Sequence, residues 1–144
     1  MKRIIAVLVL AVGLAATAGF ARPQRGGVLH VTKECSAYDP TTAGSFCTIT
    51  SSNITAIRAG MRVVYASAAE LSAGTLDSDL VIDGPGHNAA FGHVVLDLHT
   101  LTGVVTLSGG TGRFTHFHAG PLTVTCPAFP DCSWDGPYSF SPPD

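Results

Sequence analysis

Six histidines and ten acidic residues in 144 residues raise the question of a metal site. His93 and His99 lie in one alternating run, so they are about 20 Å apart at roughly 3.3 Å per residue of strand and cannot share an ion. His116 and His118 are closer, and a hairpin centred on the turn before them would place both on the outer face that carries Asp97. Exposed side chains at this spacing are more typical of a solvated surface than of a metal centre, so we predict no metal and no cofactor.

The patterns of a serine hydrolase and of a phosphate-binding loop are also missing from the sequence. Ser108 precedes a glycine pair but does not stand in a Gly-x-Ser-x-Gly turn. The run 109–112 is followed by Arg113 and not by Lys-Ser/Thr, so we interpret its glycines as those of a hairpin turn. Asp77 and Asp79 alternate with apolar residues, which indicates solvating side chains on the outer face of a strand.

Large aromatic side chains are the remaining candidates for chemistry. Tyr65, Trp134 and Tyr138 share the strand faces of apolar neighbours, and their O–H or N–H groups need a partner when buried. Together with Phe117 they are predicted to line an internal cavity that binds a small apolar ligand. Ordinary core packing, with these groups bonded to the backbone, is the alternative. We identify no inward-facing acid or base beside either tyrosine.

The elements that must position these residues are short alternating runs, broken every 8 to 14 residues by Gly, Pro, Asn or Asp. No stretch after residue 21 sustains a helical repeat over three turns. The predicted strands are Val28–Lys33, Phe46–Ile54, Met61–Leu71, Leu76–Asp83, Ala90–Leu98, Val104–Ser108, Phe117–Cys126 and Ser133–Phe140. Eight antiparallel strands with short connections favour an all-β up-and-down barrel, with a β-sandwich as the alternative.

The hairpin formed by the fifth and sixth predicted strands shows how the two faces are assigned. One face of the run 91–100 is apolar and the other is polar, so the apolar face is predicted to lie in the core. A four-residue turn would place His99 opposite Val104 and Asp97 opposite Thr106.

Residues 1–21 have a basic start, an apolar run and small residues before the expected cleavage point, which predicts a secretory signal peptide. Residues 22–144 then form a single domain, because a second one has no room. We expect this domain to be secreted or periplasmic and free of the membrane once the leader is removed. The formal net charge of -2 shows no basic footprint, so nucleic acid is not an expected partner.

The four cysteines fit an oxidising compartment and allow three disulfide pairings. Proximity along the chain favours Cys35 with Cys47 and Cys126 with Cys132, and each pair brackets turn-forming residues. A zinc site is disfavoured because no Cys-x-x-Cys spacing occurs.

Four segments, 80–84, 92–98, 108–114 and 134–140, carry a likeness to a known family. The turn Gly-Gly-Thr-Gly-Arg-Phe and the closing Trp-Asp-Gly-Pro-Tyr strand are its most specific parts. The sequence resembles small secreted bacterial members of the allene oxide cyclase and dirigent-like barrel superfamily. The resemblance implies an eight-stranded barrel with an apolar cavity, a homo-oligomer that is often a trimer, and a role with reactive hydrophobic molecules. No catalytic residue of that superfamily maps onto a motif here.

Three functions therefore remain open. The first is a secreted barrel that binds a small apolar molecule in its lumen. The second, implied by the resemblance, is a cyclase or isomerase that confines a reactive hydrophobic substrate. The third is an exported structural or partner-binding scaffold whose barrel is filled by side chains.

Overall fold

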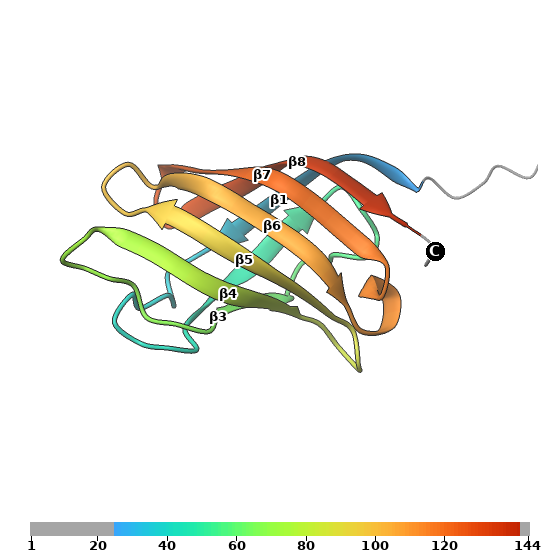
Figure 1. Ribbon diagram of the computed structural model, residues 1–144, viewed down its shortest axis with the longest axis horizontal. Helices are drawn as coiled ribbons and strands as arrows, with labels where there is room; N and C mark the ends of the chain where they lie inside the picture. Colours follow the sequence, from blue (N-terminus) through green and yellow to red (C-terminus); the bar gives the residue numbers. More distant parts are fainter. Residues whose placement is uncertain (1–24, 142–144) are drawn as a thin grey trace, which may run out of the picture.

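The protein is a closed eight-stranded antiparallel β-barrel of up-and-down order, as the sequence predicts (Figure 1). The structure is a computed structural model that describes residues 25–141. Each strand pairs with the next one along the chain, and β8 pairs with β1 to close the barrel. The strands are β1 (Gly26–Glu34), β2 (Phe46–Ser52), β3 (Arg62–Tyr65), β4 (Thr75–Asp83), β5 (Ala89–Asp97), β6 (Thr102–Gly110), β7 (Phe117–Ala128) and β8 (Asp131–Phe140). One 3-10 turn, η1 (Gly112–Phe114), lies between β6 and β7.

Alternation of apolar and polar side chains decides which face of each strand points inward. In β4, Leu76, Leu80 and Ile82 are buried, while Asp77 and Asp79 between them are exposed. The outward position predicted for these aspartates is therefore confirmed.

The third strand is shorter than the predicted Met61–Leu71 and ends at Tyr65. Beyond it the chain leaves the β3–β4 ladder, because the Ser67 amide donates to the Ser78 hydroxyl and the Ala69 amide to the Pro40 carbonyl. Side-chain hydroxyls of this kind compete with the strand ladder for backbone groups. The apolar residues at 66–71 therefore belong to a loop.

The register of the β5–β6 hairpin also differs from the prediction. Asp97 pairs with Thr102 and not with Thr106, because the chain turns at residues 98–101 with Leu101 at a positive φ of 54°. The shift is four residues, which is an even number, so it leaves every side chain on its predicted face. Val105 accordingly remains in the core.

The outer patch predicted from the late histidines is not formed. The connection holding η1 lengthens the β6–β7 loop, so His118 pairs with Ser108 near the η1 end of β6. Asp97 lies at the opposite end of the barrel wall, beside Thr102. Within residues 25–141 no group of three or more His, Cys, Asp or Glu side chains is arranged to hold a metal ion.

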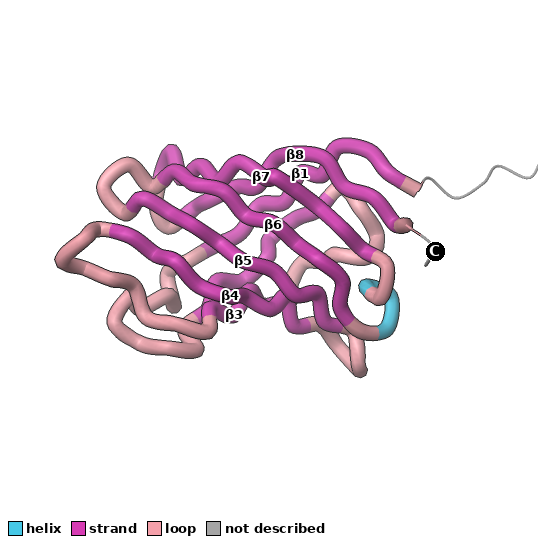
Figure 2. The backbone as a smooth tube through the Cα atoms, in the orientation of Figure 1, coloured by secondary structure: helices cyan, strands magenta, loops and turns pink. Residues whose placement is uncertain are grey.

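The two ends of the barrel are built differently, and η1 lies at one of them (Figure 2). At the end where β1 finishes, disulfides join Cys35 to Cys47 and Cys126 to Cys132, which confirms the predicted pairing. We call this the disulfide end. The opposite end, next to η1, is closed by an aromatic cluster, and we call it the aromatic end. Its rings are those of Phe114, Phe117, Tyr138 and Phe140.

Such disulfides are typical of proteins that mature in an oxidising compartment. Among residues 25–141, no helix has the length and apolar character needed to cross a membrane.

Candidate functional site

A pocket of ≈ 380 Å³ opens at the disulfide end of the barrel. Most of its lining is aliphatic or aromatic, and all four disulfide-bonded cysteines contribute to it. The lining residues are Lys33, Cys35, Tyr38, Pro40, Cys47, Tyr65, Leu71, Leu76, Leu96, Leu98, Leu101, Val124, Cys126, Phe129 and Cys132. Leu71 and Phe129 are half exposed, which indicates that they lie at the mouth of the pocket.

Lys33 is the most unusual of these residues because its amine is buried. It follows Leu29 and Val31 on the inward face of β1 and is only 5% exposed. Its Nζ donates a hydrogen bond of 2.7 Å to the hydroxyl of Tyr65. Within the described part of the chain no carboxylate forms an ion pair with it. Lysine is rarely buried unless it is paired in this way.

Burial lowers the pKa of Lys33 from 10.5 to about 7, because the apolar surroundings disfavour the ammonium form. The rings of Tyr65 and Trp134, with centroids 5.4 and 5.3 Å from Nζ, favour the cation but do not replace a carboxylate. Burial also raises the pKa of Tyr65, so its phenol stays protonated at neutral pH. The pair is therefore an amine that exists in both protonation states beside a neutral phenol.

The Cys35–Cys47 disulfide lies against the amine. Lys33 Nζ is 3.5 Å from the Cys35 sulfur and 3.6 Å from the Cys47 sulfur. The hydroxyl of Tyr65 donates only to the Cys47 sulfur, across 3.8 Å. Sulfur is a weak acceptor, so this O–H group is free to turn toward a better partner in the pocket.

A second tyrosine, Tyr38, also lines the pocket. The rings of Tyr38 and Tyr65 meet edge to face, with centroids 5.2 Å apart. The hydroxyl of Tyr38 is buried and has no hydrogen-bond partner among residues 25–141. A buried polar group without a partner is costly unless another molecule satisfies it.

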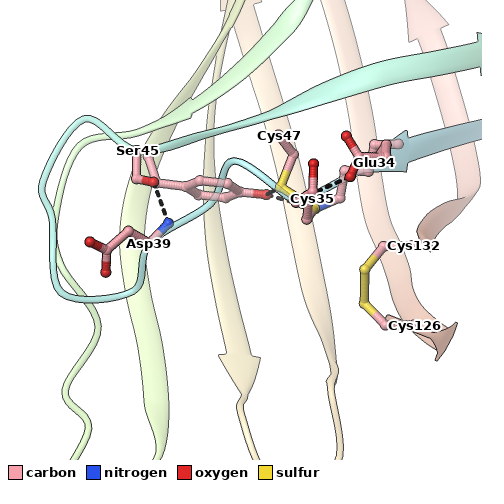
Figure 3. The surroundings of a disulfide bond; sticks show 10 residues. Glu34, Cys35, Asp39, Ser45, Cys47, Cys126 and Cys132 are labelled. Carbon is pink, nitrogen blue, oxygen red and sulfur yellow. Dashed lines mark hydrogen bonds between the residues drawn. A yellow bond between two sulfur atoms is a disulfide. The ribbon is translucent and has the colours of Figure 1, made fainter. Parts of the chain in front are cut away.

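The loop that carries Tyr38 is held by hydrogen bonds (Figure 3). The Asp39 amide donates to the Ser45 hydroxyl at 2.6 Å, and the Asp39 carboxylate accepts from Thr41 and Thr42. These bonds, those from Thr41 first, lower the pKa of Asp39. Hydrogen bonds within the loop thus fix the position of Tyr38.

The four residues predicted to line a ligand cavity divide between the two ends. Tyr65 lines the pocket, whereas Trp134 is fully buried beside Lys33 and is not among the lining residues. Phe117 and Tyr138 are absent from the lining and pack in the aromatic cluster, with centroids 6.3 Å apart. A ligand contact for any of the four stays a prediction.

Lys33 is the residue that the sequence interpretation missed, and the expectation of no inward base beside Tyr65 is wrong. Two signals could have found it. It has the parity of Leu29 and Val31, and it is the only lysine of the chain apart from Lys2. A single lysine on an apolar strand face is unusual for a residue that normally solvates the surface.

Comparison with protein-family models, with curated proteins and with solved structures gave no match. The resemblance to allene oxide cyclase and dirigent-like barrels, and the trimer it implies, therefore stay predictions. The predicted signal peptide at residues 1–21 lies outside the described residues.

Proposed function

We propose that this protein is exported from the cytoplasm and binds a small apolar molecule in the pocket at the disulfide end. The single observation that carries the proposal is an apolar pocket of ≈ 380 Å³ with a few polar groups converging in it. Small-molecule sites have this composition and a volume of roughly 300 to 1,000 Å³. The two disulfides support maturation outside the cytoplasm.

The distribution of polar atoms suggests how such a molecule would lie. Leu76, Leu96 and Leu98 offer contacts to an apolar body. The Lys33 amine and the hydroxyls of Tyr65 and Tyr38 offer partners for one polar group. A ligand that is apolar along its length and polar at one end fits this arrangement best.

Trp134 fluorescence tests the proposal directly, because this is the only tryptophan and it lies against Lys33. We expect ligands such as decanol or a monoterpene alcohol to change its emission saturably. Trp134 emission that stays unchanged with a broad panel of apolar alcohols, ketones and acids would contradict the proposal.

A matched pair of variants shows whether the pocket is the binding site. Val124 is buried and lines the pocket, whereas Val95 is half exposed on the outside of the barrel. Val124→Phe should fill part of the pocket and weaken binding, and Val95→Phe should leave binding unchanged. Equal loss in both variants would place the ligand elsewhere.

The Lys33–Tyr65 contact supports a second candidate, an enzyme of the cyclase or isomerase type. An amine with a pKa of about 7 beside a protonated phenol can accept and donate protons near neutral pH. If so, purified protein should change the product distribution of an unstable epoxide or polyene, and Lys33→Met should abolish the change. An unchanged distribution with every such substrate would count against catalysis.

A further inference from the structure

Lys33 combines three properties that are rarely found together. It lies in an apolar pocket, no carboxylate of the described chain pairs with it, and its neighbour Tyr65 has an O–H group directed only at a distant sulfur. Protein lysines that attack carbonyl carbons are held in surroundings of this kind, because desolvation leaves part of the amine neutral and nucleophilic.

We infer that Lys33 captures apolar aldehydes covalently, as an imine formed on its Nζ inside the pocket. The inference rests on the proposed function, since the pocket must first admit an apolar molecule. It adds the chemical class of the polar end, which is an aldehyde carbonyl, and it assigns Lys33 as the reacting group.

The reaction balances without an oxidant or a reductant. The lone pair of the neutral Lys33 amine attacks the carbonyl carbon and forms a C–N bond, and a proton moves from nitrogen to the former carbonyl oxygen. The C–O bond of this carbinolamine then breaks, the oxygen leaves as water, and a C=N bond remains. Tyr65 can lend its phenolic proton to the departing oxygen and recover one from the nitrogen.

The surroundings favour an aldehyde over a carboxylate. A carboxylate would bring a second charge into a pocket whose polar groups number three, and desolvating two ions is costly without further hydrogen bonds. A neutral carbonyl avoids this cost and can accept from Tyr65 and from Tyr38, whose hydroxyl has no partner among residues 25–141. Burial of the amine also lowers its pKa to about 7, so a neutral fraction exists at neutral pH.

The chain has only two lysines, so a labelled amine is easily assigned to one residue. The full chain is incubated with decanal and sodium cyanoborohydride near neutral pH, and the reduced imine is located by intact mass and peptide mapping. We expect one adduct, of the mass of decanal less one oxygen atom, on Lys33. Apart from Lys2, the α-amino group is the only other amine of the chain, and its rate of labelling is the reference for that of Lys33.

Two controls separate this inference from the proposed function. Decanol has the same chain length but no carbonyl, so it should change Trp134 emission and compete with decanal for the pocket. Lys33→Met should lose the adduct, whereas Val95→Phe on the outside of the barrel should keep both the adduct and decanol binding. Competition by excess decanol needs no variant, so the test does not depend on the folding of Lys33→Met.

Each outcome has a definite meaning. Decanol binding without an adduct on Lys33 overturns the aldehyde inference and leaves the proposed function standing. An adduct that forms on Lys33 no faster than on the α-amino group, or that decanol does not suppress, also overturns it. A decanoate affinity that exceeds that of decanol and depends on Lys33 would assign a carboxylate in place of the aldehyde. If no probe changes the emission and no adduct forms, both proposals fail.

Tyr65→Phe examines the positioning role of the phenol. Adduct formation should slow by a larger factor than decanol binding weakens, because the phenol assists loss of water in addition to any contact with a polar group of the ligand. Unchanged labelling would remove Tyr65 from the reaction and leave Lys33 in it.

Discussion

The two ends of this barrel use similar alternating strands for different purposes. At the aromatic end, Phe114 and Phe117 are fully buried, with ring centroids 5.5 Å apart, and Phe140 lies 5.0 Å from Phe117. At the disulfide end the inward positions surround a pocket and hold the amine of Lys33. Close packing stabilises the first end, while the second keeps space and a buried amine that has no carboxylate partner among residues 25–141, both of which cost stability.

Covalent bonds accompany the loss of packing at the disulfide end. Cys35–Cys47 joins the end of β1 to β2, and Cys126–Cys132 joins β7 to β8. Cross-links restrict the unfolded chain and so raise the free energy of unfolding without filling the pocket. A barrel can therefore keep a cavity at the disulfide end when the aromatic end is closely packed and disulfides cross-link the end that holds the cavity.

The largest effect is expected from the aromatic end. Phe117→Ala should lower the free energy of unfolding by about 3 to 5 kcal/mol, because it removes a ring with no exposed surface from a packed cluster. Leu71→Ala at the pocket mouth, where the side chain is 55% exposed, should cost less than about 1 kcal/mol. Urea denaturation measures both values. Similar losses would mean that the two ends are packed alike.

Removal of a disulfide should have a smaller effect than Phe117→Ala. Replacing Cys35 and Cys47 together by serine should cost about 3 kcal/mol, and the same change at Cys126 and Cys132 slightly less, because the second loop is shorter. Denaturation under non-reducing conditions gives both values. A stability unchanged by the first replacement would show that packing alone holds the disulfide end.

The buried amine should make stability depend on pH. The folded-state pKa of Lys33, about 7, lies below its ordinary value of 10.5, so between these values the unfolded chain binds more protons. The free energy of unfolding should therefore rise with pH between these two values, by up to about 1.4 kcal/mol per pH unit. Below the folded-state pKa the ammonium form is buried in every folded molecule, so the cost of burying its charge is complete there. Lys33→Met should remove this rise. A wild-type slope that persists in Lys33→Met would assign it to other groups.

The smallest effect is expected on the outer wall between the ends. His93 contacts Asp79 at 2.9 Å and Asp77 at 2.7 Å, and these hydrogen bonds, that of Asp79 first, raise the pKa of the imidazole. The stabilisation is complete below the unfolded pKa of about 6.5 and disappears as pH rises through the folded value. His93→Gln should therefore lower the urea midpoint slightly near pH 5.5 and leave it unchanged near pH 8. A larger loss at the higher pH would contradict this sign.

The sequence by itself determined the inward and outward faces and hence the barrel. The period of two is local, so Leu80 and Asp79 take opposite faces whatever the rest of the chain does. Locality along the chain also predicted both disulfides, because short loops bring their cysteines together at little entropic cost.

Position along the barrel was decided by the tertiary structure. Tyr65 and Phe117 share an inward face, yet they lie at opposite ends, because strand register and turn length set the height of each residue. Lys33 meets Trp134 because β8 pairs with β1 in closing the barrel, which places Val31 opposite Trp134. Local alternation carries no information on such pairings between distant strands, so the site emerged only when all eight strands were assembled.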